Sequence, residues 1–429
     1  MMARTIKRIL VYTHNSIGMG HAFRTLAVIT GIKHHRPDID FLVLSGSSIP
    51  HLFLGHGIEV VKLPGIKKEV DKPGSPLSPR YLATLETSAV FEYRQRVIME
   101  TFEFFSPDVV MVEHYMGGLM NEVLPLIQRK KSEEKLPRKW VLAHLSRGIC
   151  STFDFHASSA GSLAACKTSD VADMARQFDL IYVFEHPEKA DLNRELFKSV
   201  PDLQRRTHYL GPIAIKAPHE LPPRRDVIRR LGLLDKRIIL ITLGRHGPVL
   251  QMAGAILAAL HRYRFRKNYH IVMVIDPYLD HELVRALEES GLNEDAQILY
   301  FTPHLIDLVN ISELVICRAG YNIINEVLMT GATSLVIPER HPGAEQERRA
   351  GLLQRENLRV ANEYEILNGC LPGIFDDLLS RKKEPCGNIS DKYAIGCRML
   401  HDFENLLHRK RSEPEPHGKE SLSLCLDVS

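Results

Sequence analysis

The sequence predicts an α/β protein with two domains, each a Rossmann-like, doubly wound parallel sheet. Short continuous apolar runs such as Arg8–Thr13 and Arg237–Thr242 are typical of strands buried on both faces. A glycine-containing loop and a helical pattern follow each of these runs, and this rhythm favours parallel strands with right-handed crossovers. With 429 residues, the chain is long enough for two domains of ordinary size.

The composition excludes several classes of protein. The chain is 44% hydrophobic and 25% charged, as expected of a globular protein, and its formal net charge of +3 is too small to indicate a nucleic-acid partner. Its seven cysteines form no C-x-x-C pair, which argues against a zinc ribbon or a redox motif. No apolar run has the length of a targeting or membrane segment. We therefore expect a cytoplasmic protein, and peripheral contact with the inner face of a membrane stays open.

The first domain is expected over residues 1–212. Its helices are expected at Ala22–Lys33 and Tyr81–Phe105. Its strands are expected at Arg8–Thr13, Phe41–Ser45, Ile58–Leu63, Val109–Val112, Trp140–Leu145, Leu180–Phe184 and Tyr209–Gly211.

Polar residues come directly after two of these strands. Glu113 and His114 follow Val109–Val112, and Arg147 follows Trp140–Leu145. Ligands of open α/β sheets bind at the carboxyl ends of the strands. We therefore take Glu113 and His114 as ligand-site candidates, while Arg147 is either an anion-binding residue or an ordinary surface arginine.

A linker is expected at residues 213–224 and the second domain at residues 225–385. Its strands are expected at Arg237–Thr242, His270–Ile275, Gln297–Phe301, Leu314–Cys317 and Ser334–Ile337. A further helix is expected within residues 386–410. Residues 411–429 carry Pro, Glu, Ser and Gly and are expected to be disordered.

The stretch that begins at Leu314 has the strongest chemical pattern. A tight turn at Arg318–Gly320 leads into a helix whose C-cap is expected at Gly331. A helix that starts after a parallel strand presents free N–H groups and a positive dipole end to an anion. Glu326 lies six residues after Gly320, where its carboxylate could accept hydrogen bonds from two vicinal hydroxyls, as on a ribose. The alternative for Glu326 is a solvated helix residue.

The next loop adds two more candidates. Glu345 and Gln346 open the following helix and could bind further hydroxyls. Together with the turn and Glu326, they suit one diphosphate, one ribose and one sugar.

These residues carry a resemblance to a known family. The segment CRAGYNIINEVLMTG, followed by LVIPERHPGAEQERRA, closely resembles the donor-binding half of MurG-like glycosyltransferases, of glycosyltransferase family 28 type. The matching positions include Arg318, Gly320, Glu326 and the pair Glu345–Gln346, with Asn322 on the same helix as Glu326. The resemblance implies the GT-B fold, with two domains facing across a cleft and the C-terminal helix packing back toward the first domain. It also implies a nucleotide-sugar donor, usually UDP-linked.

The resemblance extends to the loop after the first strand. Gly18-x-Gly20-His21 alone is a weak motif, because it lacks the third glycine and the later acid of a dinucleotide fingerprint. MurG-like enzymes have G-x-G-G-H here, in a loop that faces the acceptor and the donor phosphates. His21 is then a candidate general base, because imidazole titrates near neutral pH, and a structural role at the helix N-terminus is the alternative. Glu113 is the second catalytic candidate, and Glu113 and His114 are the candidates for the acceptor site.

Two further loops acquire roles from the resemblance. Gly244 and Arg245 lie where the family has a G-G-S loop, so Arg245 and His246 are a departure that leaves open whether their side chains add charge to the diphosphate site. The loop from Thr302 to Leu305 is implied to hold the nucleobase through backbone groups.

The sequence therefore predicts a hexosyltransferase (EC 2.4.1.-). It would move a hexosyl unit, or an N-acetylhexosaminyl unit, from a UDP-linked sugar to an acceptor hydroxyl with inversion. No cofactor or metal is expected, and the Asp38-x-Asp40 pair is interpreted as a loop. The acceptor is open: a lipid, a glycan or a small molecule. The alternatives are a nucleotide-sugar 2-epimerase of the same fold and a non-catalytic nucleotide-sugar sensor.

Overall fold

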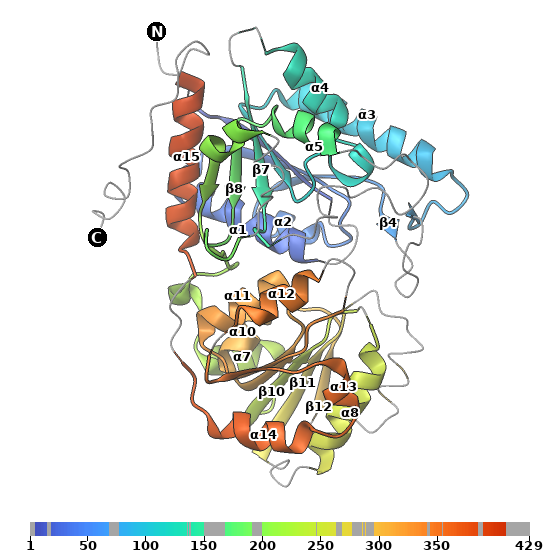
Figure 1. Ribbon diagram of the computed structural model, residues 1–429, viewed down its shortest axis with the longest axis vertical. Coiled ribbons are helices and arrows are strands. Elements are labelled where there is room, and N and C mark those ends of the chain that lie inside the picture. Colours follow the sequence, from blue (N-terminus) through green and yellow to red (C-terminus); the bar gives the residue numbers. More distant parts are fainter. Residues whose placement is uncertain are drawn as a thin grey trace. The chain divides into compact units, whose positions relative to one another are not determined.

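The computed structural model divides into two compact units (Figure 1). The first unit contains the described residues up to Ile215 and those from Ser390 onward, and the second contains Lys216–Ile389. The structure describes residues 5–14, 19–67, 77–134, 136, 139–149, 168–190, 200–245, 247–262, 268–276, 285, 288, 296–340, 344–353, 355–384 and 389–408.

The first unit is built on a parallel sheet, which has seven strands among the described residues. Its spatial order is β3 (Glu59–Lys62), β2 (Asp40–Ser45), β1 (Arg8–Thr13), β6 (Val109–Glu113), β7 (Val141–Ser146), β8 (Leu180–Val183) and β9 (Thr207–Tyr209). A small antiparallel pair, β4 (Ile66–Lys67) and β5 (Ser78–Pro79), lies apart from it. The order in which strands are added reverses between β1 and β6: β2 and β3 extend the sheet on one side of β1, and β6 to β9 extend it on the other.

The second unit repeats this plan. Its described residues form a six-stranded parallel sheet in the order β12 (Ala296–Leu299), β11 (Tyr269–Val274), β10 (Arg237–Thr242), β13 (Ser312–Cys317), β14 (Ser334–Val336) and β15 (Leu358–Val360). Here the order in which strands are added reverses between β10 and β13. The prediction of two doubly wound α/β domains is therefore confirmed at the level of the fold.

Helices pack on these sheets through apolar side chains. The first unit contains α1 (Gly20–His35), α2 (His51–Leu54), α3 (Thr87–Phe105), η1 (Leu119–Asn121), α4 (Leu124–Ser132), α5 (Thr168–Ala175), η3 (Pro201–Arg206) and α15 (Lys392–His408). The second contains η4 (Pro218–Glu220), α7 (Arg224–Leu231), α8 (Val249–Arg262), α10 (Leu305–Ile311), α11 (Tyr321–Thr330), α12 (Glu345–Gly351), α13 (Glu363–Leu367) and α14 (Leu371–Ser380). One core of the first unit joins α3, α4 and α5 to the sheet, and two cores cover the sheet of the second unit. No described helix is long and apolar enough to span a bilayer.

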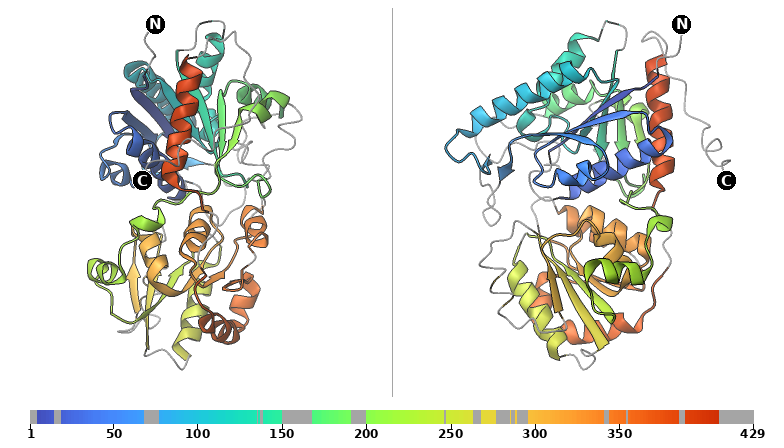
Figure 2. Two further views of the ribbon diagram at one scale, coloured as in Figure 1. Left: turned by 90° about the vertical axis from the view of Figure 1, so that its left-hand side faces the viewer. Right: turned by 180° about the vertical axis from the view of Figure 1, so that it is seen from behind.

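The C-terminal helix α15 lies along α1 inside the first unit (Figure 2). Two glycines make this close crossing possible. A Cβ on Gly31 would lie 2.2 Å from the carbonyl oxygen of Lys392, and a Cβ on Gly396 would lie 2.2 Å from backbone atoms of Gly31. The backbones touch where any side chain would keep them apart, so the last helix supports α1.

Several predicted element bounds were wrong. The helix predicted from Tyr81 begins at Thr87, because Tyr81, Leu82 and Leu85 are exposed and give this segment no apolar face to bury. The strand predicted at Tyr209–Gly211 is Thr207–Tyr209, since Gly211 has a φ of 75° that ends the extended backbone. The short elements β15, α13 and α14 had not been predicted.

Candidate functional site

The candidate residues gather near the point in each sheet where the strand order reverses. Loops that leave neighbouring strands in opposite directions create a crevice at such a point, and this is where open α/β sheets bind ligands. In the first unit these loops follow β1 and β6, and in the second they follow β10 and β13.

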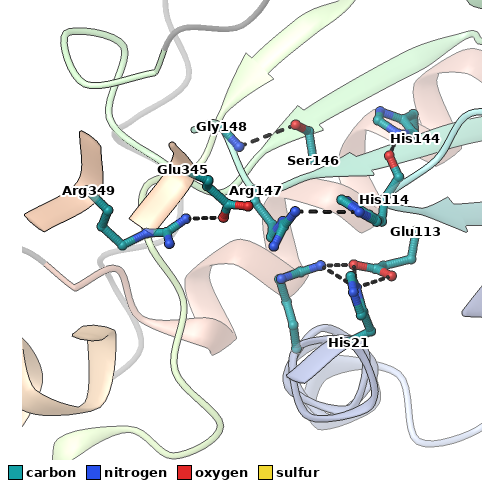
Figure 3. A network of polar contacts seen from close by, with 10 residues as sticks. His21, Glu113, His114, His144, Ser146, Arg147, Gly148, Glu345 and Arg349 are labelled. Atoms are coloured by element: carbon teal, nitrogen blue, oxygen red, sulfur yellow. Dashed lines mark hydrogen bonds and ion pairs between the residues drawn. The ribbon is translucent and has the colours of Figure 1, made fainter. Parts of the chain in front are cut away.

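In the first unit, His21 and Glu113 are brought together. Nδ1 of His21, in the first turn of α1, lies 2.9 Å from each carboxylate oxygen of Glu113, at the end of β6 (Figure 3). Glu113 has no exposed surface, and Arg24, one turn along α1, forms an ion pair with it. The carboxylate holds Nδ1 and so leaves Nε2 of His21 as the nitrogen that can exchange a proton.

Further imidazoles surround this pair. The ring centroid of His14, which follows β1, lies 4.5 Å from that of His21, and the His114 ring lies 4.7 Å from it. Burial lowers the pKa of His14 to about 3 and the pKa values of His21 and His114 well below their usual value, and the nearby arginine charges add to this. All three rings are therefore neutral at pH 7.

His114 has an unusual backbone. Its φ is 72°, a conformation that non-glycine residues adopt mainly at functional or tightly constrained sites. His144 Nε2 contacts the carbonyl oxygen of His114 at 2.9 Å, and Nη2 of Arg147 lies 3.4 Å from His114 Nε2 (Figure 3). Side chains on β7 and in the loop after it thus hold the predicted acceptor residue His114 from two sides.

A buried ion pair fixes the turn after β6. Arg94 on α3 donates two hydrogen bonds to Glu122, which also accepts from the Tyr12 hydroxyl, and none of the three side chains is appreciably exposed. The Tyr12 hydroxyl in turn accepts a hydrogen bond of 2.9 Å from the backbone N–H of Leu119. The network links β1, α3 and the segment after His114.

In the second unit, Glu326 is a buried carboxylate with spare hydrogen-bonding capacity. It lies on α11, is 5% exposed, and its Oε2 has no hydrogen-bond partner among the described residues. Burial, with the charge of Asp307, raises its pKa to about 8. A carboxyl group buried in this way is costly unless a ligand supplies donors.

The turn before α11 is tied to two other loops of the same edge. Nη1 of Arg318 lies 2.8 Å from Glu363 Oε1, at the start of α13. Gly247, in the loop after β10, has a φ of 77°, and a Cβ there would lie 2.9 Å from Nη2 of Arg318. Three strand-to-helix loops therefore meet around the Arg318 guanidinium.

The pair Glu345–Gln346 is engaged within the second unit. Arg349 binds Glu345 at 2.5 Å and donates to the carbonyl oxygen of Ala319 at 2.9 Å, which fastens α12 to the turn at Arg318–Gly320. Gln346 donates to a carboxylate oxygen of Glu339 at 2.9 Å and accepts from the Glu339 backbone N–H. Without a ligand, both side chains are therefore engaged in contacts that hold the loop before α12 in place.

The other candidates lie as follows. Gly320 is the N-cap of α11, Asn322 is in its first turn, Gly244 has a φ of 65° with open space where a Cβ would be, and Arg245 is buried. The Thr302 hydroxyl accepts from the His304 backbone N–H at 3.1 Å, just before Leu305 begins α10. In the first unit, Gly20 begins α1. Gly18 and His246 lie outside the described residues.

Sequence reasoning missed His14, Arg24, Glu339, Glu363 and Arg349. Arg24 could have been found, because it lies three residues after His21 and so on the same helix face. Arg349 follows Glu345 by four residues, the spacing of a helical ion pair. His14 could also have been found, because it directly follows the predicted strand Arg8–Thr13. Glu339 and Glu363 had no such signal.

Comparison with known families identifies the second unit. Residues 239–384 match the model of the glycosyltransferase family 28 C-terminal domain. This segment is similar to the C-terminal domain of glycosyltransferase family 28. The match covers the loops that carry Gly244, Arg318 and Glu326, so the predicted MurG-like resemblance is confirmed.

Curated relatives agree with this assignment. An uncharacterized glycosyltransferase of Methanopyrus kandleri is 25% identical over 241 residues, which is 50% of this chain and 64% of the relative. The UDP-N-acetylglucosamine–N-acetylmuramyl-(pentapeptide) pyrophosphoryl-undecaprenol N-acetylglucosamine transferase of Alkaliphilus oremlandii is 22% identical over 179 residues, which is 40% of this chain and 49% of the relative. The chain thus spans less than two thirds of either relative.

Solved structures share the fold. The UDP-GlcNAc 2-epimerase from Neisseria meningitidis, bound to UDP-GlcNAc, has a TM-score of 0.58 at 14% identity and covers 94% of this chain and 100% of its own. The glycotransferase of kitacinnamycin has a TM-score of 0.54 at 13% identity and covers 94% of this chain and 97% of its own. These likenesses confirm the GT-B fold and include both transferases and epimerases.

Proposed function

We propose that the chain is a family 28 glycosyltransferase that moves a hexosyl unit from a UDP-linked sugar to an acceptor hydroxyl, with inversion and without a metal ion. The observation that carries the proposal is the buried carboxylate of Glu326, with one oxygen that no described residue satisfies. It lies on the helix that follows the turn at Arg318–Gly320, where the helix N-terminus favours a phosphate. The two hydroxyls of a ribose would supply the missing donors.

The first unit would supply the base. His21 is neutral at pH 7, and Glu113 holds its Nδ1, so Nε2 is available to take the acceptor proton. The imidazolium that forms would be stabilised by the adjacent carboxylate. On the donor side, the N–H groups at the start of α11, together with Arg318, would stabilise the charge that develops on the leaving diphosphate.

Donor binding is the first test. Isothermal titration of the full chain with UDP-, dTDP- and GDP-sugars should give tight binding of one UDP-sugar. Glu326→Gln should weaken that binding at least about tenfold, because an amide NH₂ replaces one of the two oxygens that would accept hydrogen bonds from the ribose hydroxyls. Glu347→Gln, an exposed position on α12, is the matched control and should bind as the parent does. Folded protein that binds none of these sugars would disprove the donor assignment.

Transfer itself needs an acceptor, which we propose to be a hydroxyl compound of the lipid, glycan or small-molecule class. The named Alkaliphilus oremlandii relative makes undecaprenyl-linked compounds the first to try. Transfer should survive extensive chelation, and His21→Ala should abolish it while donor binding persists. Loss of transfer on chelation, with full recovery on adding Mg²⁺, would contradict the metal-independent route.

A 2-epimerase is the second candidate, because the fold is shared with the UDP-GlcNAc 2-epimerase from Neisseria meningitidis over 94% of this chain. An epimerase needs the nucleotide sugar alone. Nuclear magnetic resonance of UDP-GlcNAc incubated with the protein should show no inversion at C2 if the chain is a transferase. Accumulation of the C2 epimer would favour the second candidate.

A further inference from the structure

Three imidazoles and a carboxylate converge at the carboxyl edge of the first sheet. His14 follows β1, His21 is in the first turn of α1, and Glu113 and His114 are at the end of β6. One ligand atom from each of His14, His21 and Glu113 lies within 4.8 Å of the other two. His14 has no role in the proton transfer proposed above, so the grouping calls for a separate explanation.

The spacing of the rings suits a shared metal ion. Imidazole nitrogens bind Zn²⁺ at about 2.0–2.1 Å, which puts the ring centroids of two tetrahedral ligands about 5 Å apart. The observed separations are 4.5 Å for His14–His21, 4.7 Å for His21–His114 and 5.5 Å for His14–His114. Small rotations of these side chains would close the ligand atoms around one ion.

The donor chemistry of the cluster also suits a metal ion. Glu113 contacts Nδ1 of His21 at 2.9 Å, the carboxylate–histidine arrangement that orients metal-binding imidazoles through the opposite nitrogen. Nitrogen donors select Zn²⁺ and its neighbours over Mg²⁺ or Ca²⁺, which prefer oxygen ligands.

Two cations oppose the binding of an ion here. Arg24 pairs with Glu113, and Arg147 lies beside His114, so the side chains around the site carry a net positive charge. This repulsion weakens the binding of a divalent cation. The site therefore differs from a structural zinc site, in which negatively charged thiolates surround the ion. The balance favours a reversible site that fills when free metal rises.

We propose that His14 and His21, with His114 beside them and Glu113 orienting the His21 ring, form a reversible binding site for a Zn²⁺-class ion. An ion held by Nε2 of His21 occupies the lone pair that would accept the proton of the acceptor, so binding inhibits transfer. The inhibitory half of this proposal rests on the proposed function, whereas the binding half does not. A glycosyltransferase that needs no metal would thus be switched off by one.

Binding is tested on the full chain without a polyhistidine tag. After chelation and removal of the chelator, isothermal titration with ZnCl₂ should show one equivalent bound. His14→Ala and Glu113→Gln should weaken that binding by about 10–100-fold. His401→Ala, an exposed position on α15, is the matched control and should bind as the parent does. Parent protein that binds no stoichiometric zinc, or equal binding by His14→Ala and the parent, overturns the proposal.

A spectroscopic measurement on the parent protein guards against misfolded variants. Co²⁺ in a nitrogen-rich, four-coordinate site should give visible absorption bands that Zn²⁺ removes at one equivalent. Bands typical of six-coordinate aqueous Co²⁺, unchanged by Zn²⁺, would also overturn the proposal.

The inhibitory step is tested separately by transfer assays at rising Zn²⁺. Half-inhibition should occur at the concentration that half-fills the site, and chelator should restore the rate. If the protein binds zinc but neither binds nor transfers any nucleotide sugar, the proposed function fails and the metal site stands. If transfer occurs and saturating zinc leaves its rate unchanged, the inhibitory proposal fails and the function stands.

Discussion

At the scale of single residues, Glu326 shows how a buried carboxyl group opposes stability. Its buried carboxyl group has a pKa raised to about 8, whereas the same group in an unfolded chain titrates near 4.5. Between these values the folded protein holds a proton that the unfolded chain has released. The contribution of Glu326 to folding stability therefore falls as pH rises from about 5 to about 8, and stays low above that.

This gives a prediction for Glu326→Gln. Without ligand, the variant should be more stable than the parent, on the order of 2 kcal/mol at pH 8, because the neutral amide avoids the burial of charge. The gain should shrink toward zero near pH 5. Urea unfolding at pH 5, 6.5 and 8 measures it. A variant that is less stable than the parent at pH 8 would mean that the described surroundings do satisfy the charge.

Gly247 gives a second prediction at this scale. Its φ of 77° strains any other residue, and a Cβ there would lie 2.9 Å from Nη2 of Arg318, so the guanidinium would have to shift. Gly247→Ala should cost about 1 kcal/mol from the backbone alone and should weaken donor binding, because the guanidinium must move from Glu363. Gly254→Ala on α8, where nothing lies within 4 Å, is the control and should stabilise by about 0.5–1 kcal/mol. Thermal melts of both variants measure the change in stability, and donor titrations measure the change in binding.

At the scale of elements, the crossing of α1 and α15 determines where the candidate base lies. Helix α1 begins at Gly20 and carries His21 and Arg24, and its other end is held against α15 at Gly31 and Gly396. Because the backbones touch, a side chain at either glycine must push the helices apart. We expect this contact to affect both stability and the position of the imidazole.

Gly31→Ala is the corresponding prediction. The added methyl carbon would lie 2.2 Å from the Lys392 carbonyl oxygen, so the variant should lose about 1–3 kcal/mol or more of folding stability. Gly373→Ala on α14 meets no atom within 4 Å and serves as the control. The measurement is denaturant unfolding of both variants, and equal stability of Gly31→Ala and the parent would show that the helices can separate at no cost.

Also at this scale, periodicity predicted the long apolar strands well and the short edge elements poorly. Arg8–Thr13 and Arg237–Thr242 were predicted with their observed bounds, because central parallel strands are apolar on both faces. Strand β15 has only three residues, two of them exposed, so it carries no such pattern. The start of α3 was missed because Tyr81, Leu82 and Leu85 look like core residues in the sequence but are exposed.

At the scale of the whole molecule, the two units differ in how the chain builds them. The second unit is continuous from Lys216 to Ile389, whereas the first also needs the segment from Ser390 onward. That segment is fastened near the end of the first stretch: Ser390 N–H donates to the Pro212 carbonyl oxygen at 2.9 Å, and Lys392 donates to that of Ile215 at 2.9 Å. The first unit therefore depends on residues from both ends of the chain.

A chain truncated after Ile389 tests this organisation. Removal of α15 exposes the face of α1 around Gly31, so the first unit should unfold at a temperature well below that of the full chain. The second unit keeps its cores and should still melt in a transition that UDP-sugar shifts upward. Differential scanning calorimetry with and without donor measures both transitions. A single transition unchanged from the full chain would contradict the division.

The sequence by itself determined the fold class, the resemblance of the second unit to glycosyltransferase family 28 and the candidates Glu326, His21 and Glu113, because each of these rests on a local pattern of strand, turn and helix. Only the tertiary structure decided that His21 meets Glu113 across 92 positions of sequence, that His14 and His114 join them, and that Glu363 reaches Arg318. Sheet order decides such meetings, since the strand order of each sheet reverses at one point, and loops that are distant in the sequence meet there at the same edge. Burial decides the rest: the same carboxyl group titrates near 4.5 in a solvated helix and near 8 at Glu326, and no single sequence states which environment it will have.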